Sequence, residues 1–198
     1  MEIAIAGCGI TGTAAACLLA REGHRVTLYE RSSVCGPIGA GLMLQPSGQQ
    51  VLADIGLLEQ VEACSTKLKG MTARQISGKP LVRLRYEHLK AGLHGLGVHR
   101  GRLFQLLYDS CQQAGAEVKT GRQVRGYRAS SVPVEKKTTL LLETENGIEE
   151  DGEFDFIIAA DGSHSALRDQ LANETGQTPG IIDYDHAALW MTSQSDYQ

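Results

Sequence analysis

The feature that most constrains the fold of this chain is a glycine-rich turn near its N-terminus. Gly7, Gly9 and Gly12 form the pattern G-x-G-x-x-G, between an apolar segment at 2–6 and an Ala- and Leu-rich segment at 10–22. A strand, such a turn and a helix in this order are typical of dinucleotide-binding α/β units. The first glycine permits a tight turn, the second lets a diphosphate approach the backbone, and the third lets the helix pack closely on the strand.

An acidic residue follows the glycine turn at the spacing of a nucleotide site. Residues 25–30 are short and β-branched and predict a second strand, parallel to the first. Glu30 ends this strand, where a carboxylate accepts hydrogen bonds from adenosine ribose hydroxyls. The N–H groups at the helix start, which holds Ile10 and Thr11, are predicted to face the diphosphate. These features predict a site for an ADP group and leave FAD and NAD open.

The remaining segments predict further helices and strands. Helices are expected at 45–56, with Pro46 in the first turn, and at 99–115, which has one apolar face. Residues 31–45 are predicted to be a loop near the ligand. Short strands are expected at 71–77, 80–86, 116–120, 124–129, 138–143, 154–160 and 187–194, with a hairpin turn at Asn146–Gly147. The segment expected to be a strand at 154–160 is apolar except for Asp155, as in a strand buried in a parallel sheet.

A second turn follows that apolar strand. Asp161–Gly162 lies at its carboxyl end, where ligands bind in open α/β sheets. Ser163 or Ser165 can cap the short helix that follows, and Arg168 carries a guanidinium suited to phosphate. The alternative is a capped strand–helix junction with a surface Arg–Asp pair.

Composition argues against several other functions. The net charge is −4, and the basic residues at 67–90 have little aromatic interleaving, so we expect no nucleic-acid binding. Five cysteines without a C-x-x-C pair predict reduced thiols in a cytoplasmic protein and no metal site. No apolar run reaches the length of about 18 residues that predicts a membrane span.

The turn at Asp161–Gly162, in the stretch DFIIAADGSHSALR, resembles the DG fingerprint of the para-hydroxybenzoate hydroxylase-like FAD-dependent monooxygenases, which are single-component aromatic hydroxylases. Other segments resemble the same family in the same order. Glu30–Arg31 is similar to its acidic and basic residues at the adenosine, and Gly39-Ala40-Gly41-Leu42 to its loop near the flavin. His99-Arg100 followed by Leu103 is similar to its H-R-x-x-L helix start.

The resemblance implies a set of cofactor-binding residues. For FAD these are Gly7, Gly9, Ile10, Thr11, Gly12, Glu30, Arg31, Gly41, Arg100, Asp161 and Gly162. His164 and Arg168 become candidates for the phosphates of NAD(P)H, although a solvated loop histidine is an equal alternative for His164. No catalytic residue is nominated.

The resemblance also implies a fold and an activity. We expect an α/β chain in which residues 1–68 and 98–180 form a Rossmann-like FAD-binding domain with a parallel sheet and a β-meander. Residues 69–97 and 181–198 are expected to begin a mixed-sheet substrate domain. Because the family's Gly-Asp motif does not follow Arg168, we expect the chain to be an N-terminal part of such a protein. The intact protein would use FAD, NAD(P)H and oxygen to hydroxylate a small, electron-rich, usually aromatic substrate.

Three alternatives stay open at this point. The FAD fold could serve a reductase or a halogenase, and the fragment could be a non-catalytic dinucleotide-binding module. An NAD-dependent dehydrogenase would fit the glycine turn but would leave Asp161–Gly162 and Arg100 unexplained. Substrate identity, the choice between NADH and NADPH, and oligomeric state are not indicated by the sequence.

Overall fold

The computed structural model describes residues 1–36, 39–130, 137–145, 147–177 and 180–182. The chain forms two compact units, Met1–Gly36 with Leu107–Ala188 and Pro37–Leu106 with Leu189–Gln198. The α/β class is confirmed. The predicted boundaries of a cofactor domain and a substrate domain stay a prediction, and the strand expected at 187–194 lies outside the described residues.

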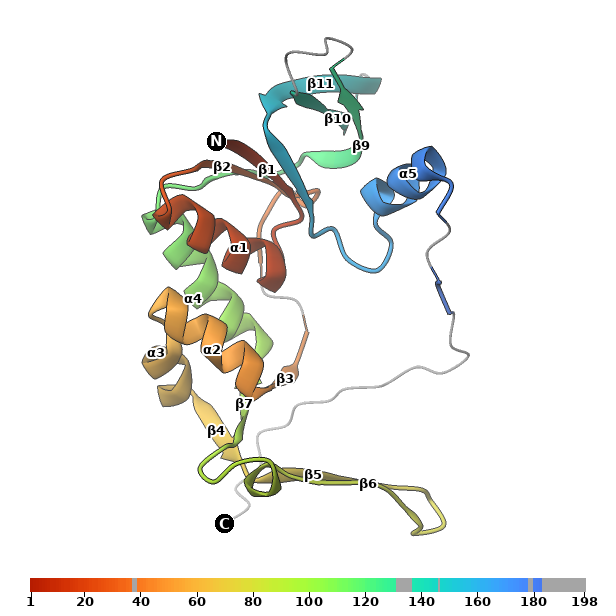
Figure 1. Cartoon of the computed structure of the whole chain (residues 1–198). Helices are drawn as coiled ribbons and strands as arrows, with labels where there is room; N and C mark the ends of the chain where they lie inside the picture. The colour runs from red at the N-terminus through yellow and green to blue at the C-terminus, as the bar shows by residue number, and fades with distance from the viewer. Residues whose placement is uncertain (37–38, 131–136, 146, 178–179, 183–198) are drawn as a thin grey trace. The chain divides into compact units, whose positions relative to one another are not determined.

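A four-stranded parallel sheet organises the first unit (Figure 1). Its strands, in spatial order, are β12 (Phe156–Ala159), β1 (Glu2–Ala6), β2 (Arg25–Tyr29) and β8 (Glu117–Lys119). Helix α1 (Ile10–Arg21) connects β1 to β2, so the predicted βαβ unit is present. Strand β1 is paired on both sides, which is why its residues from Ile3 onward are apolar and buried.

Strand β12 differs from the buried strand that the sequence predicts at 154–160. It begins at Phe156, and among the described strands it pairs with β1 alone, so it lies at the edge of the described sheet. Phe156 is 58% exposed. The apolar sequence of this segment therefore predicted its parallel pairing correctly, but the predicted burial is wrong.

A β-meander accompanies the parallel sheet. Strands β9 (Gln123–Ala129), β10 (Thr138–Thr144) and β11 (Gly147–Phe154) pair antiparallel in the order β11-β10-β9. The predicted antiparallel ribbon is thus confirmed. Thr144 pairs with Gly147 at the end of the β10–β11 ladder, whereas Asn146 of the predicted hairpin turn lies outside the described residues.

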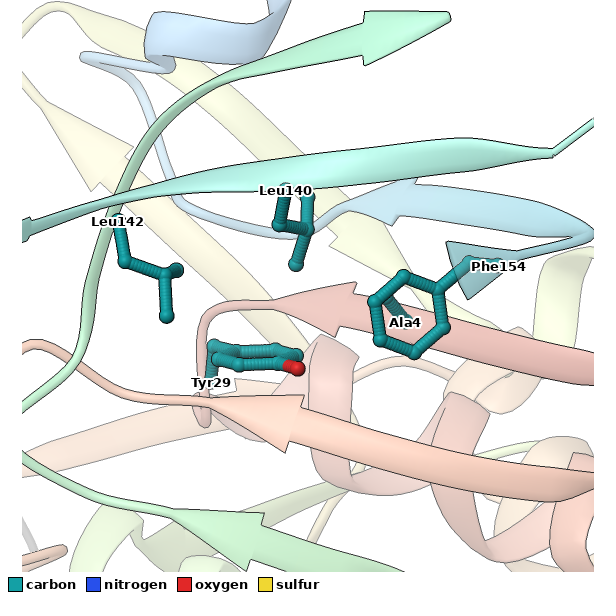
Figure 2. Packing of buried hydrophobic residues seen from close by; sticks show 5 residues of the cluster. All are labelled: Ala4, Tyr29, Leu140, Leu142 and Phe154. Carbon is teal, nitrogen blue, oxygen red and sulfur yellow. The ribbon is translucent and has the colours of Figure 1, made fainter. Parts of the chain in front are cut away.

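The meander packs on the parallel sheet through a small apolar cluster (Figure 2). Ala4 and Tyr29 come from the sheet, and Leu140, Leu142 and Phe154 come from the meander. The rings of Tyr29 and Phe154 meet edge to face, with centroids 6.2 Å apart, a favourable arrangement for two aromatic rings. This cluster ties the meander to the end of β2, directly before Glu30.

A polar bridge adds to the same contact. The Tyr29 hydroxyl donates to Asp151 Oδ2 at 2.9 Å, and Lys119 Nζ donates to the same oxygen at 2.8 Å. Lys119 Nζ also lies 5.3 Å from the centroid of the Tyr29 ring. Burial by itself would raise the pKa of Asp151, but the hydrogen bonds from Lys119 and Tyr29 outweigh it, and the pKa lies below its ordinary value.

The described residues of the second unit form small antiparallel sheets and helices. Its elements are β3 (Gly41–Leu44), α2 (Pro46–Ile55), α3 (Leu58–Ala63), β4 (Ser65–Leu68), β5 (Gly70–Arg74), β6 (Pro80–Arg85), the 3-10 turn η1 (Tyr86–His88) and β7 (Gly95–His99). The sheet orders are β3-β7-β4 and β5-β6. Helix α2 and the β5–β6 hairpin agree with the sequence prediction. Helix α4 (Arg100–Gln113) begins in the second unit and ends in the first.

The loop predicted at 31–45 is partly wrong, because β3 occupies its end, and β7 was not predicted. Both strands are short and contain glycine, which is depleted in strands and obscures the pattern. Packing explains one of these glycines, since a Cβ atom at Gly95 would lie 2.7 Å from the Tyr86 hydroxyl.

We predict that Asp151→Asn lowers the free energy of unfolding by about 1–3 kcal/mol at pH 7, because the variant loses charge-assisted hydrogen bonds. Since folding lowers the pKa of Asp151, its contribution is present above the unfolded-state pKa and is lost as pH falls through the folded-state pKa. Urea unfolding should therefore show a nearly constant difference in the free energy of unfolding between Asp151→Asn and wild type at pH 5–7. The difference should become smaller below about pH 4. Glu153→Gln, an exposed change on the same strand, is the control. Equal stability of Asp151→Asn and wild type at pH 7 would contradict the bridge.

Candidate cofactor site at the carboxyl ends of the parallel strands

The first glycine of the turn brings β12 close to β1. Gly7 has φ +102°, a conformation that glycine adopts readily, and its N–H donates to the Tyr29 carbonyl at 2.8 Å. A Cβ atom here would lie 2.3 Å from the Ala160 carbonyl oxygen and 3.0 Å from Asp161 Cα. The absence of a side chain therefore places Asp161 beside the glycine turn.

The other two glycines have different surroundings. A Cβ atom at Gly12 would lie 1.9 Å from the Gly7 carbonyl oxygen, so the third glycine serves the close contact of helix and turn. A Cβ atom at Gly9 would meet no atom within 4 Å. Gly9 is the N-cap of α1, and no side chain caps the start of this helix, where Ile10 and Thr11 follow. The space over Gly9 and the helix start thus suits an anionic group.

Glu30 joins the glycine turn to the segment after β2. Its Oε2 accepts a hydrogen bond from the backbone N–H of Cys8 at 3.1 Å, and its Oε1 accepts from the N–H of Ser32 at 2.9 Å. A carboxylate has about four acceptor positions, so capacity remains for ribose hydroxyls. Arg31, the next residue, is exposed.

Cys8 contributes its backbone rather than its thiol. Burial and a hydrogen bond with the Cys35 thiol raise the pKa of Cys8 well above its ordinary range. The thiol is therefore neutral at pH 7 and adds no negative charge to the turn. Sequence reasoning did not single out the Cys8 amide, although its place between two glycines is a usable signal.

Asp161 has one satisfied and one unsatisfied carboxylate oxygen. Its Oδ2 accepts from the N–H of Ala166 at 3.0 Å, at the start of α5 (Ala166–Thr175). Its Oδ1 is buried and has no hydrogen-bond partner among the described residues. A buried acceptor without a partner is costly unless a ligand supplies a donor. Gly162 has φ +90° and turns the chain from β12 toward the helix.

The residues after Gly162 have local partners. Ser165 caps α5 by accepting from the N–H of Arg168 at 3.1 Å, as predicted. The Arg168 guanidinium donates to the Ser163 carbonyl at 2.8 Å and pairs with Asp169 at 2.8 Å. The surface Arg–Asp pair of the alternative interpretation is therefore present. His164 is exposed.

Glu30, the glycine turn and Asp161 follow neighbouring strands of one parallel sheet. The spatial order β12-β1-β2 places the glycine turn between Asp161 and Glu30. A ligand with its diphosphate over Gly9 would extend toward Glu30 in one direction and toward Asp161 in the other. This arrangement suits a dinucleotide, which has two nucleoside-like halves joined by a diphosphate.

Two further predicted residues lie in the second unit. The N–H of Arg100 donates to the Ala40 carbonyl at 3.0 Å, and Gly41 pairs with His99. A Cβ atom at Gly39 would lie 3.2 Å from Arg100 Cδ, so the glycine makes room for the arginine side chain. Gly41 and Arg100 thus belong to one local arrangement; their role toward FAD stays a prediction.

Within the described ranges, no group of three or more His, Cys, Asp or Glu side chains could hold a metal ion. Of the helices in those ranges, none has the length and apolar character needed to cross a membrane.

Comparison with known proteins decides the family. Residues 1–194 match the family described as FAD binding domain. The chain belongs to this family. The predicted resemblance and the FAD-binding fold are confirmed, and the curated relatives include aromatic FAD-dependent monooxygenases.

Two of these relatives and one solved structure illustrate the match. The chain is 30% identical over 167 residues to 2-heptyl-3-hydroxy-4(1H)-quinolone synthase of Mycobacteroides abscessus, covering 84% of this chain and 41% of that protein. It is 28% identical to kynurenine 3-monooxygenase of Stenotrophomonas maltophilia, covering 98% and 43%. A crystal structure of 2-methyl-3-hydroxypyridine-5-carboxylic acid oxygenase superposes with a TM-score of 0.68 at 27% identity, covering 86% and 42%. The chain therefore spans less than half the length of these proteins.

We predict that alanine at the second and third glycines of the turn has different effects on stability. Gly12→Ala should lower the free energy of unfolding by about 3 kcal/mol, because the new methyl group collides with a backbone carbonyl. Gly9→Ala should cost no more than about 1 kcal/mol, from the loss of a good N-cap. Urea unfolding followed by circular dichroism measures both. An equal loss in the two variants would mean that the space over Gly9 is not free.

Proposed function

We propose that this chain binds FAD across the carboxyl ends of β2, β1 and β12, as the cofactor-binding part of a monooxygenase. The intact enzyme would use NAD(P)H and oxygen to hydroxylate a small aromatic substrate. One observation supports the mode of binding above all. The unpartnered Asp161 Oδ1 and the Glu30 carboxylate lie on opposite sides of a glycine turn that leaves open space over Gly9.

The placement of the cofactor follows from the order of the strands. The adenosine ribose would bind at Glu30, and the diphosphate would lie over Gly9 and the start of α1. The ribityl and flavin half would extend toward β12, where Asp161 Oδ1 can accept a hydrogen bond from a hydroxyl group. Arg31 follows Glu30, is exposed, and is proposed to contact the adenosine side.

In such an enzyme the cofactor and the protein would have different roles. FAD supplies hydride acceptance and oxygen activation when it is bound. The residues of this chain orient it, through the backbone N–H groups of the glycine turn and the carboxylates of Glu30 and Asp161. His164 and Arg168 are proposed to contact the phosphates of NAD(P)H, next to the turn at Gly162.

The substrate class is proposed from the relatives. The relatives named above include a quinolone synthase and a kynurenine monooxygenase, and the similar crystal structure is that of a pyridine-carboxylate oxygenase. Each name contains an aromatic compound. A cytoplasmic setting is proposed as well, because all five cysteines are free thiols in the structure.

We predict that the 198-residue chain binds FAD and that Gly9→Ala weakens this binding at least about tenfold, a loss of about 1.4 kcal/mol. The added methyl group would occupy the space in which the diphosphate approaches the backbone. Quenching of FAD fluorescence during titration measures the affinity. Gly180→Ala is the matched control, because its Cβ atom also meets nothing within 4 Å. Unchanged affinity in Gly9→Ala would refute this mode of binding.

The proposed reaction requires a test on the full-length protein. Oxygen consumption and NAD(P)H oxidation should rise when an electron-rich aromatic compound is added, and a hydroxylated product should accumulate. NAD(P)H oxidation that reduces an added electron acceptor and forms no hydroxylated product would favour a reductase instead.

A further inference from the structure

Strand β9 is the outer strand of the meander, yet the outward-facing backbone groups of one of its residues are hydrogen-bonded. The sheet order β11-β10-β9 leaves the far side of β9 without a neighbouring strand in the described chain. Gln170 of α5 fills this position at Tyr127. Its Oε1 accepts from the Tyr127 N–H at 2.9 Å, and its Nε2 donates to the Tyr127 carbonyl at 2.8 Å. The side-chain amide thus replaces the peptide group of an adjacent strand.

The strand is shaped to receive this amide. A Cβ atom at Gly126 would lie 2.6 Å from Gln170 Oε1, so any larger residue would displace the amide. The β9–β10 register shifts next to Gly126, as in a β-bulge, which redirects the strand locally. Glu174 completes the contact, because it accepts from the Tyr127 hydroxyl at 2.6 Å and from Gln170 Nε2 at 2.7 Å. We call this set of contacts the Gln170 clamp.

The helix that carries the Gln170 clamp also holds Asp161 in place. Gln170 lies about one helical turn after Ala166, the residue whose N–H donates to Asp161 Oδ2. A displacement of α5 along β9 would therefore move the donor that orients the Asp161 carboxylate. Ser165, which caps the same helix, is buried and would move as well.

We infer that Gln170 is a positioning residue for the cofactor site: by pairing with the backbone of Tyr127 it holds the start of α5, and so directs Asp161 Oδ1 toward the ligand. This inference rests on the proposed FAD-binding function. It concerns only the half of the ligand that extends over β12, since Glu30 and Gly9 follow the strands β2 and β1.

This asymmetry provides the test. We expect Gln170→Ala to weaken FAD binding about tenfold, while the affinity for ADP, which contains only the half that binds Glu30 and the glycine turn, stays within about twofold of wild type. A loss of general structure would lower both affinities. Isothermal titration calorimetry with FAD and with ADP gives the two values.

Two more variants separate the amide pairing from packing. Gln170→Glu keeps the size of the side chain but has no N–H for the Tyr127 carbonyl, so it should behave as Gln170→Ala. Gly126→Ala leaves Gln170 intact and displaces its amide, and should have the same effect. Asn173→Ala, at an exposed position on α5, is the control and should match wild type.

A measurement on the unliganded chain tests whether Gln170 holds the start of α5, and it does not depend on FAD binding. Hydrogen exchange should accelerate at least about tenfold at the amides of Tyr127 and Ala166 in Gln170→Ala, with the amides of β1 unchanged. If the amide of Ala166 keeps its protection, or if FAD and ADP affinities fall together, the inference is wrong. If wild type binds neither FAD nor ADP, the proposed function fails, and the exchange at Ala166 still tells whether Gln170 holds the start of the helix.

Discussion

The parallel pairing of β1 with β2 on one side and β12 on the other is the constraint on which the candidate site depends. It brings residues 30 and 161 to the carboxyl ends of parallel strands in one sheet, although 131 positions separate them in the chain. The pairing is possible at this distance because Gly7 has no side chain where the Ala160 carbonyl approaches. A single glycine therefore serves the turn and the junction with β12 together.

The three glycines of the turn have separable roles in this fold. Two of them satisfy contacts within the protein, because a Cβ atom would meet backbone atoms at 2.3 Å or 1.9 Å. A Cβ atom at Gly9 would meet no described atom within 4 Å, and we propose that glycine at this position leaves space for a ligand.

The meander connects both ends of the candidate site to their surroundings. It packs on Tyr29 and bridges it to Lys119 through Asp151, next to Glu30 at the end of β2. Its strand β9 pairs with Gln170 of α5, the helix whose first N–H donates to Asp161. We propose that these contacts orient the two carboxylates.

Local patterns were enough to predict the glycine turn, the acid at the end of β2, the strand before Asp161, the Ser165 cap and the antiparallel pair β9–β10, because each depends on a short period or a turn residue. The β3 and β7 strands were missed, since glycines interrupt their pattern and only their mutual pairing makes them strands. The exposed edge of β12, the Asp151 bridge and the Gln170 clamp could be known only from the fold. Each joins residues from different elements, and no local period in a chain encodes which distant backbone group a polar side chain will meet.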